Sequence, residues 1–105
     1  MEPDRWTPIG RADAWPQPGV RVVQLGARKI AVWRLADGSF RALKDHCPHR
    51  GVILSNGTVA DGQVACRAHG WRFDLASGAC THGDAAARAV AYAVRVRDGE
   101  VELGA

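Results

Sequence analysis

The sequence contains no hydrophobic run longer than a handful of residues, whereas a helix needs about 18 apolar residues in succession to span a bilayer. It also contains no run of basic residues, because its 14 Lys and Arg are scattered and stand against 11 Asp and Glu, for a net charge of +3. So small a surplus is not the electrostatic footprint of a nucleic-acid-binding protein. We therefore expect neither a membrane nor a nucleic acid as partner.

Cysteine is scarce as well. The three cysteines, Cys47, Cys66 and Cys80, are an odd number and cannot all pair in disulfides. The first ten residues include Glu2 and Asp4 and lack the apolar stretch of a secretory signal, so we expect a cytoplasmic protein. In that compartment cysteines are more often metal ligands or buried thiols than parts of a disulfide framework.

The chain has 105 residues, of which 47% are apolar and 24% charged, as is typical of a globular protein. This length predicts a single domain over residues 1–105 and leaves no room for a second, which argues against a multidomain enzyme. Domains this small often gain stability from disulfides or a metal centre.

Short strands separated by glycine turns predict an antiparallel all-β fold. We expect these strands at residues 20–25, 29–35, 39–43, 58–60, 63–66, 71–75, 79–80, 90–97 and 100–103. Before them, four prolines in the first 18 residues favour extended or turn structure, with at most one helical turn near residues 10–15. Apolar residues alternate along residues 90–97 and share one face of that strand. The expected core includes Trp33, Phe40 and Tyr92.

Two short segments combine a thiol with an imidazole. They read Cys-x-His at 47–49 and Cys-x-x-His at 66–69, and 16 residues separate His49 from Cys66. Sulfur and nitrogen donors together suit several metals. A structural zinc site usually contains a Cys-x₂₋₄-Cys pair, which is missing here, so a zinc-stabilised binding module is the weaker alternative.

Beyond these donors the sequence resembles the Rieske [2Fe–2S] family, of the soluble ferredoxin or ring-hydroxylating oxygenase type. The resemblance rests on Cys-Pro-His-Arg-Gly at 47–51, Gly57, Gly62, His-Gly-Trp-Arg-Phe-Asp-Leu at 69–75 and Gly-Ala-Cys at 78–80. It implies an antiparallel β-sandwich with a small cluster-binding subdomain of two ligand loops, at about residues 45–82.

The resemblance also implies one [2Fe–2S] cluster per chain, with Cys47 and Cys66 on one iron and His49 and His69 on the other. Neutral imidazoles make the cluster less negative than four thiolates would, which raises its reduction potential. The respiratory branch of the family adds a disulfide and a serine that bonds the cluster, where this sequence has Val52, Ala68 and Trp71. We therefore expect the low end of the Rieske range, about −150 mV rather than +300 mV.

Three further residues stand near the two motifs. We interpret His46 as a surface residue or as one that supports a ligand without binding metal itself. We interpret His82 as an exposed loop residue that is not a ligand, and Cys80 as a buried small hydrophobe. Residues 81–89 contain no proline, whereas many relatives carry a proline-bearing loop over the cluster.

Three arginines, Arg50, Arg67 and Arg72, are expected to form a basic rim that attracts an acidic redox partner. The function that the resemblance implies is a one-electron carrier between a flavin-containing NAD(P)H reductase and a terminal oxygenase, and not an enzyme in itself. The alternative is the Rieske domain of a longer non-haem iron oxygenase chain, although the closing hairpin argues against a fragment.

Overall fold

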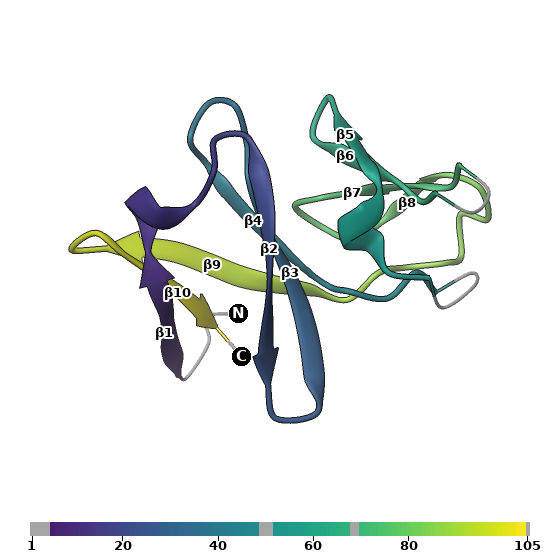
Figure 1. Cartoon of the computed structure of the whole chain (residues 1–105). Helices are drawn as coiled ribbons and strands as arrows, with labels where there is room; N and C mark the ends of the chain where they lie inside the picture. The colour runs from purple at the N-terminus through teal and green to yellow at the C-terminus, as the bar shows by residue number, and fades with distance from the viewer. Residues whose placement is uncertain (1–4, 49–51, 68–69, 105) are drawn as a thin grey trace.

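The computed structural model describes residues 5–48, 52–67 and 70–104, which form two antiparallel sheets (Figure 1). The larger sheet has the order β1-β10-β9-β4-β3-β2, and its strands are β1 Trp6–Arg11, β2 Gly19–Leu25, β3 Arg28–Arg34, β4 Phe40–Lys44, β9 Ala91–Arg97 and β10 Glu100–Gly104. The smaller sheet has the order β5-β6-β7-β8, and its strands are β5 Thr58–Ala60, β6 Gln63–Ala65, β7 Arg72–Asp74 and β8 Cys80–His82. The all-β expectation is confirmed.

The smaller sheet is an insertion between β4 and β9, which are neighbours in the larger sheet. The Lys44 amide donates to the Val90 carbonyl at 2.8 Å, so the chain leaves the larger sheet and re-enters it at one place. Figure 1 shows the inserted strands beside the larger sheet, on the side away from the β9–β10 turn. Everything inserted is therefore held at both of its ends by the larger sheet.

Strand β3 is buried on both faces and separates two apolar cores. Its residues Ile30 and Val32 pack in a core inside the curled larger sheet, and Ala31 and Trp33 pack in a second core. This second core, called the inter-sheet core below, contains Ala31, Trp33, Leu43, Cys47, Leu54, Val64, Cys66, Phe73, Leu75 and Ala89. Because its members come from both sheets, the inter-sheet core joins the insertion to the rest of the molecule.

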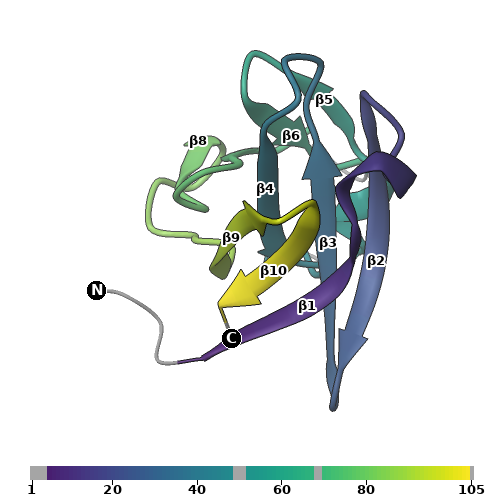
Figure 2. The same ribbon diagram turned by 90° about the vertical axis from the view of Figure 1, so that its left-hand side faces the viewer.

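Strand β1 was not expected from the sequence. It pairs with β10 and lies beside it in the larger sheet (Figure 2). The register shifts between Pro8 and Gly10, so the proline stands at an irregularity. The Arg95 guanidinium lies 4.0 Å from the centre of the Trp6 ring and also pairs with Glu102 at 2.7 Å. These cross-strand contacts hold β1 on the sheet.

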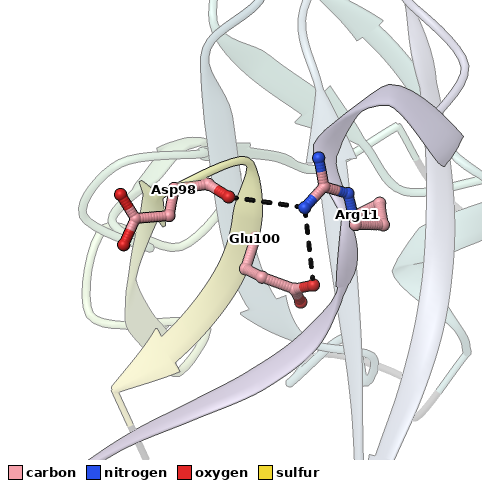
Figure 3. A network of polar contacts seen from close by, with 3 residues as sticks. All are labelled: Arg11, Asp98 and Glu100. Carbon is pink, nitrogen blue, oxygen red and sulfur yellow. Dashed lines mark hydrogen bonds and ion pairs between the residues drawn. The ribbon is translucent and has the colours of Figure 1, made fainter.

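A second group of contacts ties the end of β1 to the β9–β10 turn. Arg11 donates to the Asp98 carbonyl at 3.4 Å and pairs with Glu100 at 3.8 Å (Figure 3). Both partners of the ion pair are exposed, so the pair itself adds little stability. The Ala12 amide also donates to the Gly99 carbonyl at 2.9 Å, and the single helical turn expected here is the 3₁₀ turn η1 Ala12–Ala14.

The three expected core residues differ in how deeply they are buried. Trp33 and Phe40 are buried, whereas Tyr92 is partly buried. The apolar face expected along residues 90–97 is covered only in its middle, because Val90 and Val96 are 50% and 48% exposed. They extend beyond the two cores, and only Tyr92 and Val94 pack against the core of the larger sheet. None of the helical segments in the described ranges is long and apolar enough to cross a membrane.

The close packing of the turn before β8 can be tested by substitution of its glycine. Gly78 has a φ of +79°, and a Cβ there would lie 2.1 Å from the Ala89 carbonyl oxygen. We expect Gly78→Ala to lower the free energy of unfolding, measured in urea, by about 1–3 kcal/mol more than Gly62→Ala, the cost typical of an overpacked site. Gly62 is the matched control because its φ is +74° with nothing within 4 Å of a Cβ. Equal losses would contradict the account.

Candidate metal centre

The first thiol–imidazole motif begins shortly after β4. Cys47 is fully buried in the inter-sheet core, and its amide donates to the Val52 carbonyl at 2.7 Å. This bond joins residues five apart and closes the segment 47–52 into a loop. Pro48, the next residue, is exposed. The thiol thus lies at the base of a closed loop, in an apolar environment.

The second motif is closed in the same way. Cys66 follows β6 directly, is 1% exposed, and donates its amide to the Trp71 carbonyl at 2.6 Å, again five residues on. The Gly70 amide donates back to the Cys66 carbonyl at 2.9 Å, and Gly70 has a φ of +72° that favours glycine. Segment 66–71 is therefore a second closed loop with a buried thiol at its base.

Both cysteines belong to the inter-sheet core, so the fold brings the two loops to one apolar cluster. No disulfide joins Cys47, Cys66 or Cys80 in the part of the chain that the structure describes. His49 and His69 fall within the two closed loops by sequence and lie outside the described residues, as does Arg50. The structure thus describes the sulfur half of the expected donor set.

The first loop is anchored by a buried carboxylate that was not expected from the sequence. Asp45 is 7% exposed, and its oxygens accept the Ser55 amide at 2.7 Å and the Ser55 hydroxyl at 2.8 Å. Its own amide donates to the Lys29 carbonyl at 2.8 Å. Asp45 therefore ties the start of the loop to β3 and to the 3₁₀ turn η2 Leu54–Asn56. The one signal in the sequence was an acidic residue between a strand and the first cysteine.

The other candidate residues lie around the loops. His46 is exposed, and its amide donates to the Lys44 carbonyl. His82 is exposed as expected, but it stands in strand β8 opposite Arg72 rather than in a loop. Cys80 is half-buried against the inter-sheet core, and its thiol donates to the His82 carbonyl at 3.4 Å.

Two of the three rim arginines, Arg67 and Arg72, are exposed, and the third lies outside the described residues.

The turn that leads from β7 to β8 is fixed by Asp74, whose carboxylate accepts hydrogen bonds from Ser77 and from the Ala76 amide. The Ser77 amide is the main cause that lowers the pKa of Asp74 below its usual value. A groove of about 540 Å³ lies between the start of β2 and the β5–β6 hairpin, and neither buried cysteine lines it.

The donor chemistry fits an iron–sulfur centre. Thiolate is the form of cysteine that binds metal, and a bare thiolate in an apolar core is costly unless a cation neutralises it. The two buried cysteines at the bases of the closed loops supply soft sulfur donors, and the sequence adds a nitrogen donor two or three residues after each of them.

Comparison with known proteins agrees with this chemistry. The model of the Rieske [2Fe–2S] domain matches residues 5–96. The chain belongs to the Rieske [2Fe–2S] family.

Two relatives show how the domain is used elsewhere. The chain is 36% identical over 100 residues to the anthranilate 1,2-dioxygenase ferredoxin subunit of Burkholderia cepacia, and the match covers 93% of this chain and 90% of that protein. It is 33% identical over 107 residues to the oxidoreductase NdmD of Pseudomonas putida, covering 94% of this chain. The chain spans only 18% of the length of NdmD. Relatives of this domain therefore occur both as short chains and within long ones.

Solved structures share the fold over nearly the whole chain. One is the complex of reduced oxygenase and oxidized ferredoxin in carbazole 1,9a-dioxygenase, with a TM-score of 0.83, 29% identity, and coverage of 94% of this chain and 92% of that one. Another is a putative NADH-dependent nitrite reductase small subunit from Mycobacterium tuberculosis, with a TM-score of 0.85, 26% identity, and coverage of 94% and 93%.

We expect Asp45→Asn to destabilise the protein by about 1.5–3 kcal/mol in urea unfolding, because it weakens two hydrogen bonds to a buried charged group. Asp37→Asn is the matched control. Asp37 also accepts an amide and a hydroxyl from one serine, Ser39, at 2.9 and 2.6 Å, but it is exposed. A loss at Asp45 no larger than the loss at Asp37 would refute its anchoring role.

Proposed function

We propose that this protein is a Rieske-type ferredoxin, a one-electron carrier whose [2Fe–2S] cluster is bound by Cys47 and Cys66 on one iron and by His49 and His69 on the other. The observation that carries the proposal is the pair of closed loops, each with a buried cysteine at its base in one shared core. When bound, the cluster supplies reversible one-electron chemistry.

The chain's own residues position the donors and keep water away from them. Burial in the inter-sheet core surrounds both thiols with apolar side chains, and Asp45 holds the first loop in place. The amides of Cys47 and Cys66 close the two loops by donating to the carbonyls of Val52 and Trp71. The expected potential near the low end, about −150 mV, rests on Val52, Ala68 and Trp71, which stand where the respiratory branch has a disulfide and a serine.

The proposed partners are a flavin-containing NAD(P)H reductase as donor and a terminal oxygenase as acceptor. The anthranilate dioxygenase ferredoxin subunit, which this chain matches over 90% of its length, supports a carrier role in a dioxygenase system. The ferredoxin–oxygenase complex of carbazole 1,9a-dioxygenase supports direct contact with an oxygenase. A single domain over residues 1–105, a cluster-binding part at about 45–82 and a cytoplasmic location stay predictions.

The alternative is that the domain works within a longer non-haem iron oxygenase chain. The long relative NdmD supports the occurrence of this domain within a longer chain. The two roles are separable by adding NADH, reductase and an aromatic substrate. A carrier oxygenates nothing unless a terminal oxygenase is also present, whereas turnover by this protein with reductase alone would favour the enzyme.

The ligand assignment predicts that variants of the four ligands lose the cluster, whereas a variant of a nearby non-ligand histidine keeps it. We expect Cys47→Ser and His69→Ala to abolish the visible absorbance and iron content and to unfold much of the small sheet, because metal binding and folding are coupled in small domains. His82→Ala is the control and is expected to leave the spectrum unchanged. Full iron content in either ligand variant would refute the assignment.

The basic rim predicts a dependence on salt. If Arg67 and Arg72 attract an acidic partner, the rate of electron transfer falls as ionic strength rises, because screening weakens charge steering. Arg67→Glu and Arg72→Glu are expected to slow transfer at low salt. Arg97→Glu, an exposed arginine beside the β9–β10 turn, is the matched control. A rate that does not change with salt would rule the rim out.

A further inference from the structure

Strand β8 leads into a segment, residues 83–89, that lies against the second closed loop. At its start Gly83 meets the indole ring of Trp71, the residue whose carbonyl closes that loop. A Cβ on Gly83 would lie 2.5 Å from Trp71 Cδ2 and 2.8 Å from both Cγ and Cε2. The Gly83 backbone therefore lies directly on the ring, with no space for a side chain between them.

Glycine is required at this position for a second reason. Gly83 has a φ of +132°, a conformation that residues with a Cβ rarely adopt. Just before it, the β7–β8 register shifts, with Arg72 opposite His82 but Phe73 opposite Cys80. This irregularity in β8 precedes the residue that contacts Trp71.

Packing and hydrogen bonds fix the residues on both sides of the contact between Gly83 and Trp71. Trp71 packs against the inter-sheet core, and its carbonyl accepts the Cys66 amide at 2.6 Å. The segment is fixed at its far end by Ala89, which is buried and donates its amide to the Gly78 carbonyl at 2.8 Å. Between these points the Asp84 carboxylate accepts the Ala86 amide at 2.9 Å. The backbone on each side of the contact is therefore fixed by hydrogen bonds, and the Trp71 side chain is supported by the inter-sheet core.

We propose that Trp71 is a positioning residue for the cluster, held against the second closed loop by the backbone of Gly83. Through this contact, segment 83–89 acts as a strap that fixes the loop carrying Cys66. This inference rests on the proposed function, because it assigns the strap to a loop that binds the cluster. A displaced Trp71 would loosen the loop and admit water, and both changes alter the electrostatic environment of the cluster.

The test compares two glycine variants of the purified holoprotein. Gly83→Ala introduces the clash with Trp71. Gly10→Ala is the matched control, because Gly10 has a φ of +137° and also faces a tryptophan, with a Cβ 3.2 Å from Trp15 Cζ3, but in the core of the larger sheet. Both variants are expected to unfold at lower urea concentration. Only Gly83→Ala is expected to shift the reduction potential and the EPR signal of the reduced cluster.

The loss of cluster absorbance in air gives a second measure. We expect Gly83→Ala to lose its cluster at least about tenfold faster than Gly10→Ala, the factor that corresponds to 1.36 kcal/mol in a barrier. In a Trp71→Leu background, where the ring is absent, Gly83→Ala is expected to have a much smaller additional effect, as a double-mutant cycle would show.

The outcomes separate the two proposals. A wild-type protein without iron and acid-labile sulfide overturns the proposed function. A wild-type protein with an intact cluster, in which Gly83→Ala and Gly10→Ala share one potential and one rate of cluster loss, overturns the strap alone. The strap is also overturned if the effect of Gly83→Ala is equally large with leucine at position 71, because the effect would then come from backbone strain.

Discussion

The site depends on one repeated constraint, the backbone bond that closes each cysteine loop. Cys47 donates to Val52, and Cys66 donates to Trp71, over the same interval of five residues. Each bond places a buried cysteine at the base of a loop. Because both bases lie in one apolar core, the loops are held in common by packing that the metal centre does not itself provide. The cluster then supplies the charge neutralisation that two buried thiolates need.

The topology explains how so small a chain achieves this. The cluster-binding part is inserted between β4 and β9, and its entry and exit are joined by the bond from Lys44 to Val90. Strand β3 supports the inter-sheet core with one face and the core of the larger sheet with the other. β1 and β10 lie side by side in the larger sheet, outside the insertion. This arrangement is compatible with relatives that carry the domain within a much longer chain.

Much of this fold was accessible from the sequence, because strands and glycine turns are encoded locally. The bounds of β5 match the expected ones, and most other strands were placed to within a residue or two. Features that depend on distant residues were missed. β1 forms because it pairs with β10 and because its Trp6 ring contacts the Arg95 guanidinium. The Asp45 carboxylate can be buried because it accepts a hydrogen bond from Ser55. The contact of Gly83 with Trp71 joins residues twelve apart that no local pattern connects. Val90 and Val96 show that a local pattern can also predict too much. Both follow the regular alternation of the strand, yet each side chain is about half exposed.

The most direct test of the cluster assignment is pulsed EPR on the dithionite-reduced protein, combined with analysis of iron and acid-labile sulfide in the same sample. We predict equal amounts of iron and sulfide, and magnetic coupling of the cluster to the nitrogens of two histidine ligands. His69→Ala, which is expected to lose its iron, is predicted to give no cluster signal. Iron and sulfide without nitrogen coupling would mean a cluster bound without histidine ligands. Such a result would contradict the assignment of His49 and His69, and with it the central claim.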